Sequence, residues 1–361
     1  MMKLLVLAQT PPPVHGQSLM VQLLVEGLPK CGIEVHHVQM RLSRSHADIG
    51  HWRPEKILVT LLATLSARRI ARRERCTALY YVPSPAKRGA FYRDLVAMGI
   101  CRNPRLALVL HWHAFGLGEW VTTRANPFER ALGRRLLGGA DLALVLAPEL
   151  EADAAIFNPK RTVVVPNGLP DSGPPAIHTT GKRCEILFLG LGSREKGLFD
   201  TVEAVAQLNS ANPGGYRLTF AGSFPSAADE LAFNSRASEL RGAVRHVGFA
   251  DEPRKRALFG EADLFCLPTR YPHEGQPLAL IEAMANDLRI VTSRWRAIPR
   301  MLPPQFVWYA EPGNTASLAT AVECAAGSPP PGGASRRHFL THFTIERHLA
   351  AMTEALSSLD S

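Results

Sequence analysis

Short apolar runs alternate with segments of helical periodicity along most of the chain. The runs hold four to eight residues and are rich in Leu, Val and Ile, which is typical of strands buried on both faces of a parallel sheet. They predict strands at residues 3–8, 32–38, 78–82, 106–113, 141–146, 162–165, 185–190, 216–221, 244–249, 262–267 and 289–292. Helices are predicted between them, at 19–28, 57–65, 90–100, 126–137, 149–157, 199–208, 230–240, 253–259, 278–285, 317–326 and 345–359. This alternation predicts an α/β protein.

A segment without periodicity separates two such series. Residues 170–182 are rich in Pro, Gly, Ser and Thr, which predicts an interdomain linker. We therefore expect a first domain at 1–168, a linker at 169–182, a second domain at 183–338 and a terminal segment at 339–361. A chain of 361 residues is long enough for two doubly wound domains with separate cores.

Composition narrows the class of protein. Hydrophobic residues make up 46% of the chain and charged residues 20%, so wholesale disorder is not expected. No apolar run reaches the length of a membrane span, and the first residues read as a strand rather than a signal peptide. The six cysteines form no CxxC pair or metal-like cluster. We therefore expect reduced thiols, a cytoplasmic location and no bound metal.

The positive charge is concentrated in the first half. The formal net charge is +9, and the stretch from Arg41 to Arg105 holds 14 Lys or Arg against 4 Asp or Glu, a local excess of 10. No zinc-finger, helix-turn-helix or aromatic RNA-binding motif accompanies it, so nucleic acid is not expected as a partner. The apolar stretch 57–65 runs directly into SARRIARRER. This order suits a helix lying on an anionic membrane, although a core helix with a solvated basic end fits as well.

The most informative stretch is PTRYPHEGQPLALIEAMA, residues 268–285. It continues a predicted strand through a polar loop into a helix, and ligands of open α/β sheets bind at such carboxyl ends of strands. Glu274 lies in the loop and Glu282 eight residues later on the helix. Backbone amides from Gln276 to Leu278 are expected at the helix N-terminus, where they could accept a phosphate. Two carboxylates around an amide nest suit a nucleotide sugar.

HEGQPLALIEAMA resembles the donor-site motif of retaining glycosyltransferases of family 4, which have the GT-B fold. The resemblance implies two Rossmann-like domains that face a cleft, with the C-terminal helix crossing back to the first domain. It implies that Glu274 binds hydroxyls of the donor sugar and that Glu282 binds the nucleotide ribose. It also implies a metal-independent enzyme without a cofactor, since the nucleotide sugar is a substrate.

Other residues acquire expected roles from the same resemblance. His111 and His113 share one face of a strand end, and His113 is the favoured contact to the donor sugar. The sequence departs from the family at His15, where a glycine is common, and at Leu191, where an Arg is usual. The implied donor-binding residues are Gly16, Ser193, Arg194, Lys196, Gly222, Val247, Glu274, Gly275, Gln276, Pro277, Leu278 and Glu282. The implied catalytic residues are His113, Glu274 and Lys196, with His111 and His15 as alternates.

The reaction implied is sugar transfer to a hydroxyl of a glycan or lipid-linked glycan, in cell-envelope or exopolysaccharide assembly. Lys196, with Arg194 in place of the missing Arg, would face the diphosphate. An anionic membrane at the inner face of the plasma membrane is a further candidate partner. Three alternatives stay open: a nucleotide-sugar epimerase of the same fold, a scaffold that binds without catalysis, and a basic membrane-surface protein.

Overall fold

The computed structural model describes residues 2–41, 55–173, 181 and 183–359. The chain divides into two units. Unit 1 comprises Met1–Gly168 and Ile345–Ser361, and unit 2 comprises Leu169–Thr344. Of the predicted linker, residues 174–180 and 182 lie outside the described residues.

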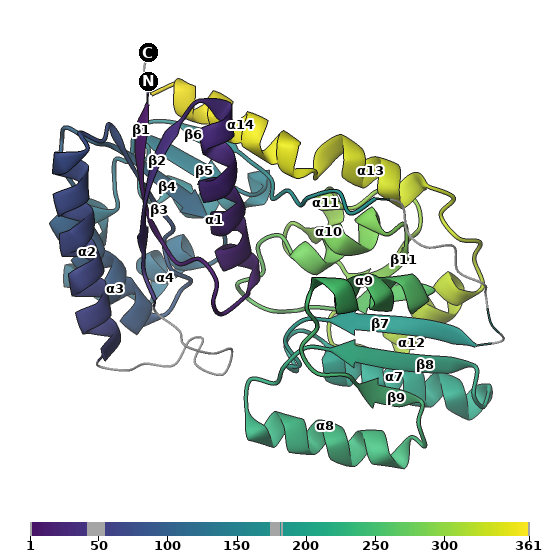
Figure 1. The fold of residues 1–361 in the computed structure, drawn as a ribbon. Coiled ribbons are helices and arrows are strands. Elements are labelled where there is room, and N and C mark those ends of the chain that lie inside the picture. Colours follow the sequence, from purple (N-terminus) through teal and green to yellow (C-terminus); the bar gives the residue numbers. More distant parts are fainter. Residues whose placement is uncertain (1, 42–54, 174–180, 182, 360–361) are drawn as a thin grey trace. The chain divides into compact units, whose positions relative to one another are not determined.

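Unit 1 is built on a parallel six-stranded sheet in the order β2-β1-β3-β4-β5-β6 (Figure 1). Its apolar runs are buried on both faces, as the sequence pattern predicts for a parallel sheet. The strands are β1 Lys3–Ala8, β2 Glu34–Gln39, β3 Ala78–Tyr81, β4 Ala107–Trp112, β5 Leu142–Val145 and β6 Thr162–Val164. The helices are α1 Gly16–Gly27, η1 Leu28–Cys31, α2 Glu55–Arg73, α3 Arg88–Cys101, α4 Leu117–Thr123, α5 Pro127–Leu136, η3 Pro148–Leu150, α6 Glu151–Ala155 and α14 Ile345–Ser357.

The last helix, α14, belongs to the core of unit 1. Met352 and Leu356 are buried in the cluster that also contains Val6 and Tyr80 of the sheet and Leu24 of α1. The segment that joins unit 1 therefore begins at Ile345 rather than at residue 339. The reason is that α13, Ala334–His342, packs on α10 of unit 2 instead.

Unit 2 contains a second parallel sheet, in the order β12-β11-β10-β7-β8-β9. Figure 1 places α9 and α10 on one face of it and α7 and α12 on the other. The strands are β7 Cys184–Leu189, β8 Tyr216–Ala221, β9 Val244–His246, β10 Leu264–Leu267, β11 Arg289–Ser293 and β12 Val307–Ala310. The helices are α7 Leu198–Ala211, α8 Ala227–Glu239, α9 Glu252–Glu261, α10 Leu278–Ala285, α11 Ile298–Met301, α12 Thr315–Ala326 and α13.

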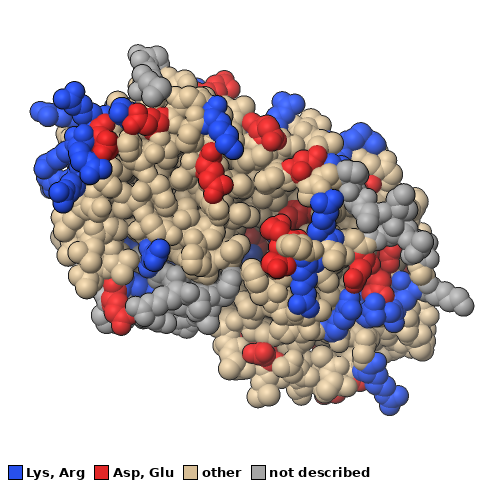
Figure 2. Space-filling view, viewed as in Figure 1, with Lys and Arg blue, Asp and Glu red and all other residues tan. Residues whose placement is uncertain are grey.

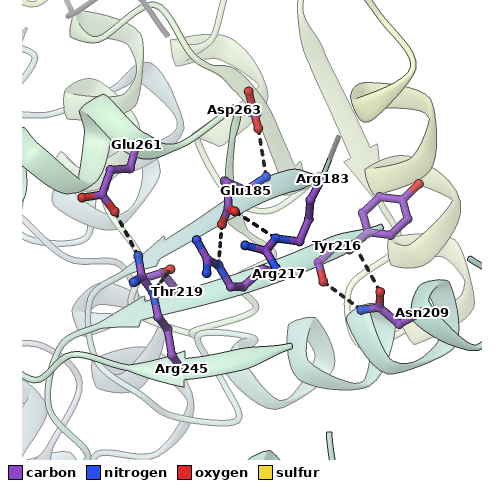
Figure 3. Close-up of polar contacts among 9 residues, drawn as sticks. All are labelled: Arg183, Glu185, Asn209, Tyr216, Arg217, Thr219, Arg245, Glu261 and Asp263. Atoms are coloured by element: carbon purple, nitrogen blue, oxygen red, sulfur yellow. Dashed lines mark hydrogen bonds and ion pairs between the residues drawn. The ribbon is translucent and has the colours of Figure 1, made fainter. Parts of the chain in front are cut away.

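Ion pairs cross the starts of β7, β8 and β9 (Figure 3). The Glu185 carboxylate accepts hydrogen bonds from Arg217 on β8 at 2.8 Å and from Arg183 at 3.0 Å. On β9, Arg245 donates to Thr219 at 2.8 Å and pairs with Glu261 of α9 at 3.0 Å. These ion pairs connect the amino ends of neighbouring strands. They therefore lie at the edge of the sheet opposite to the carboxyl ends, where the ligand site is expected.

Most of the predicted helices and strands are present in the structure, but some differ in length and others were not predicted. The predicted helix 149–157 is a short 3₁₀ turn followed by α6 only, and the strand predicted at 244–249 ends at His246. β12, α4 and α13 were not predicted. β12 is an edge strand, and three of its four residues are only half-buried although the run VWYA is apolar. In the described part of the chain, no helix has the length and apolar character that crossing a bilayer demands.

Candidate functional site

The strand order of unit 2 reverses between β7 and β10. From β7 the chain continues to β8 on one side, whereas from β10 it continues to β11 on the other. Such a switch point leaves an opening at the carboxyl ends of the two central strands, which is where ligands of open α/β sheets bind. The loops that leave these two strands carry Lys196 and Glu274, so the sequence motif lies at the expected edge of the sheet.

Glu274 and Lys196 form an ion pair across this switch point. The Glu274 carboxylate accepts hydrogen bonds from Lys196 Nζ at 2.7 Å and from Thr269 Oγ1 at 2.9 Å, and the residue is only 6% exposed. The Lys196 ammonium also lies 5.0 Å from the centroid of the Tyr271 ring. These two hydrogen bonds hold the buried carboxylate in a fixed orientation.

The loop that carries Lys196 is fastened to the loop after β10 by backbone contacts. Gly197 has φ +84°, and a Cβ there would lie 2.5 Å from the Pro268 carbonyl oxygen. Only glycine accepts both the left-handed conformation and this close approach. The Arg270 N–H donates to the Glu195 carbonyl at 2.7 Å, and its guanidinium pairs with Asp200 at 2.6 Å. Lys196 is therefore held in place by the backbone that precedes and follows it.

Glu282 is paired with a lysine that the sequence reading did not single out. Glu282 lies on α10 and forms an ion pair with Lys255 of α9, which also pairs with Glu252 at 2.6 Å. Burial raises the pKa of Glu282, and the Lys255 charge acts against this rise. Nothing in the sequence links two residues that are 27 positions apart on different helices. Each of the two motif carboxylates thus has its own lysine.

The start of α10 differs in one respect from the expected amide nest. Residues 274–277 are buried and α10 begins at Leu278, with Pro277 as its N-cap. Proline has no backbone N–H, so of the stretch Gln276 to Leu278 only the first and last residues carry an amide donor. The expected amide nest therefore consists of the Gln276 and Leu278 N–H groups.

Glycines allow the loops after β7 and β8 to approach closely. A Cβ on Gly222 would lie 1.8 Å from the Gly190 carbonyl oxygen, and the Gly222 N–H donates to Gly248 at 2.9 Å. Val247 follows β9, and its N–H donates to the Phe220 carbonyl at 3.0 Å. Gly222 and Val247 thus lie in adjoining loops of unit 2.

Arg194, which is proposed to replace the missing arginine, and Ser193 lie in the loop before α7. The Arg194 guanidinium lies 4.5 Å from the centroid of the Phe199 ring. Ser193 accepts a hydrogen bond from the Lys196 N–H at 3.1 Å. Leu191, at the position of the usual arginine, is 38% exposed.

In unit 1, His15 caps the helix that Gly16 begins. The Ser18 N–H donates to His15 Nδ1 at 3.3 Å, and the His15 N–H donates to Ser18 Oγ at 3.0 Å. This reciprocal arrangement satisfies donors at the start of α1. The sequence signal for this capping box is Ser18, three positions after His15, although His is an unusual N-cap residue.

The two histidines at the end of β4 lie together, as the alternation predicted. Their ring centroids are 4.2 Å apart, with His113 Nε2 3.2 Å from His111 Nδ1. The Tyr80 hydroxyl lies 2.8 Å from the same Nδ1. Burial, together with the nearby His348 and His15, lowers the pKa of His113 to about 3, so this imidazole is neutral near pH 7. His111 is fully buried and His113 only partly, so His113 is the one with exposed surface.

Comparison with known proteins shows which family the second unit resembles. Residues 183–327 match the family model described as "Glycosyl transferases group 1". This part of the chain is therefore similar to the group 1 glycosyl transferases. The match contains both carboxylates and both lysines described above. Within the described residues, no group of three or more His, Cys, Asp or Glu is arranged to hold a metal ion.

Two curated relatives each match about two fifths of the chain. The glycogen synthase of Mycobacterium tuberculosis is 32% identical over 146 residues, which is 40% of this chain and 34% of the relative. The amylovoran biosynthesis glycosyltransferase AmsK of Erwinia amylovora is 30% identical over 142 residues, 38% of this chain and 34% of the relative. Each match thus spans about a third of the relative's length.

The fold is similar over the whole chain to that of solved glycosyltransferases. The sucrose-phosphate synthase of Thermosynechococcus elongatus superposes with a TM-score of 0.77 at 18% identity, covering 99% of both chains. Two six-stranded parallel sheets and this likeness identify the fold as GT-B.

Proposed function

We propose that this protein transfers a sugar from a nucleotide diphosphate-sugar to a hydroxyl of a glycan acceptor. The observation that carries the proposal is that the group 1 match contains the Lys196–Glu274 pair at the sheet's switch point and the Lys255–Glu282 pair on α9 and α10. Paired carboxylates beside fixed cations suit a ligand with hydroxyls and a diphosphate. The curated relatives are a glycogen synthase and an amylovoran glycosyltransferase, which supports a role in polysaccharide synthesis.

Glu274 and Lys196 would serve the sugar and the diphosphate. A carboxylate offers about four acceptor positions, of which Lys196 and Thr269 use two, so Glu274 can still accept sugar hydroxyls. An ammonium has three donors, and Glu274 takes one of them. The others could face phosphate oxygens, where negative charge builds up as the diphosphate leaves. Glu282 would accept hydrogen bonds from the ribose hydroxyls at the lone pairs of its carboxylate that Lys255 does not use.

His113 would act as a neutral hydrogen-bonding group. Its low pKa means that it adds no positive charge to the diphosphate. It suits a contact to a hydroxyl of the donor or acceptor instead. We further propose, from the resemblance of the motif, that the anomeric configuration is retained and that neither a metal ion nor a cofactor is required.

We place the reaction at the inner face of the plasma membrane, with a lipid-linked glycan as the favoured acceptor and a soluble glycan as the second. An epimerase would release nucleotide and an altered sugar without an acceptor, and a scaffold that binds without catalysis would leave the donor intact.

The deciding experiment incubates the purified chain with UDP-, GDP- and ADP-sugars, with and without acceptor, and follows nucleoside diphosphate release and the product's anomeric proton by NMR. Acceptor-dependent release with a retained anomer supports the proposal. Release of an epimerised sugar, or no release with any donor, would contradict it.

A further inference from the structure

The exposed and buried sides of α2 are reversed from what a surface helix normally shows. Its buried side consists of small or polar residues, namely Thr60, Ala63, Thr64, Ala67 and Ala71. Its outer side carries Ile57, Leu58, Leu61, Leu62 and Leu65, which are between 38% and 59% exposed. A helix of a globular protein usually turns its large apolar residues to the core.

This outer side is the largest concentration of exposed apolar residues on any one element. Of the thirteen exposed large hydrophobic side chains in the described part of the chain, five lie on α2, in the nine-residue stretch 57–65. Single exposed leucines are ordinary, but a contiguous set on one helix face marks an interaction surface.

The same face becomes basic along the helix. Arg68 and Arg72 continue the row formed by Ile57, Leu61 and Leu65, because the spacings of three and four residues keep them on one side. Arg69 follows Leu62 by seven residues, about two helical turns, and Arg73 follows Arg69 by four, so both extend the row of Leu58 and Leu62. All four arginines are exposed, and within the described residues Arg68, Arg69 and Arg72 form no ion pair. In Figure 2, Lys and Arg gather over the part of unit 1 where α2 lies in Figure 1.

We propose that this face of α2 is a docking surface for an anionic lipid bilayer. The aliphatic side chains would enter the boundary between headgroups and acyl chains while the arginines bind anionic headgroups, with the helix lying in the plane of the interface. The occupant is a lipid surface rather than a protein because the unpaired arginines lie in the same rows as the aliphatic residues and complement a uniformly anionic plane. The inference stands on the surface of α2 and is independent of transferase activity, while it supplies the membrane location that a lipid-linked acceptor requires.

The test is co-sedimentation of the full chain with vesicles of phosphatidylcholine alone or mixed with phosphatidylglycerol. We expect binding to the mixed vesicles that weakens with added salt, and little binding to the neutral ones. The double substitution Leu61→Ser and Leu62→Ser should lower the partition coefficient about tenfold or more, since it removes two inserted side chains. Leu231→Ser is the matched control, because Leu231 is 72% exposed on α8 of unit 2 and should leave binding unchanged.

Three outcomes would overturn the proposal. These are no binding to the mixed vesicles, equal binding by wild type and the α2 double variant, and self-association of the wild type that the double variant abolishes. The last would assign the face to a second copy of the chain. Turnover with a soluble acceptor, measured in the same samples, should be equal in wild type and double variant. A membrane result and a transferase result can therefore fail separately.

Discussion

Replacing Glu282 separates its contribution to folding from its contribution to ligand binding. In Glu282→Ala, Lys255 keeps only Glu252 as a partner, and that carboxylate is on a side chain that is 79% exposed. The Lys255 side chain is 14% exposed, so an incompletely paired ammonium would remain largely buried. Breaking a buried ion pair by removing one partner costs about 3–5 kcal/mol. Because Glu252 remains, we expect a loss of about 2–4 kcal/mol in the free energy of unfolding.

A second variant removes both charges. Lys255→Met combined with Glu282→Leu fills the same space with apolar atoms and should be close to wild type in stability. It should still lose affinity for the nucleotide sugar by roughly 10- to 100-fold, because hydrogen bonds to a charged group contribute about 1.5–3 kcal/mol each.

Urea unfolding followed by circular dichroism and calorimetric titration of the donor measure the two effects. A stable double variant with wild-type affinity would refute the assignment of Glu282 to the ligand. Full stability of Glu282→Ala would refute the ion pair itself.

Three further predictions follow from the geometry. Lys196→Met should lower kcat/KM about 100-fold or more in steady-state kinetics, because it removes one electrostatic donor to the charge that develops on the diphosphate. Wild-type turnover in this variant would show that the diphosphate is bound elsewhere. Gly197→Ala should reduce the urea midpoint more than Gly214→Ala does, since both glycines have positive φ but only Gly197 would clash with a backbone oxygen; equal losses would contradict this. The pKa of His113 is about 3 in the folded protein and about 6.5 in the unfolded chain, so between these values the unfolded chain binds more protons. The free energy of unfolding should therefore fall as the pH drops below about 6.5. This fall should be shallower in His113→Gln, and an equal slope in the two proteins would contradict the prediction.

The sheet architecture could be predicted because its signal is local. Residues 4–8, LLVLA, and 186–189, ILFL, are apolar throughout, and in the structure they lie in β1 and β7, which are interior strands of their sheets. The alternation at the end of β4 predicted that His111 and His113 share a face, and their rings are in contact. The edge strand β12 was missed although its residues, VWYA, form a short apolar run of the same kind.

The partners of the site residues could not be predicted, because they depend on packing between distant segments. Lys255 reaches Glu282 only once α9 and α10 lie on the same face of the sheet. Tyr80 reaches His111 because β3 and β4 are neighbours in register. The reversal of polarity on α2 also required the structure, since periodicity indicates that two faces differ without saying which one is buried.

The central claim is that the second unit binds a nucleotide diphosphate-sugar between two lysine-paired carboxylates. The most direct measurement is the melting temperature of the wild type and of a Glu274→Gln, Glu282→Gln double variant with UDP-, GDP- and ADP-sugars. The account predicts a rise for the wild type with the sugars of one base and little or none for the double variant. Equal rises in the two proteins, or no rise with any of the three bases, would contradict it.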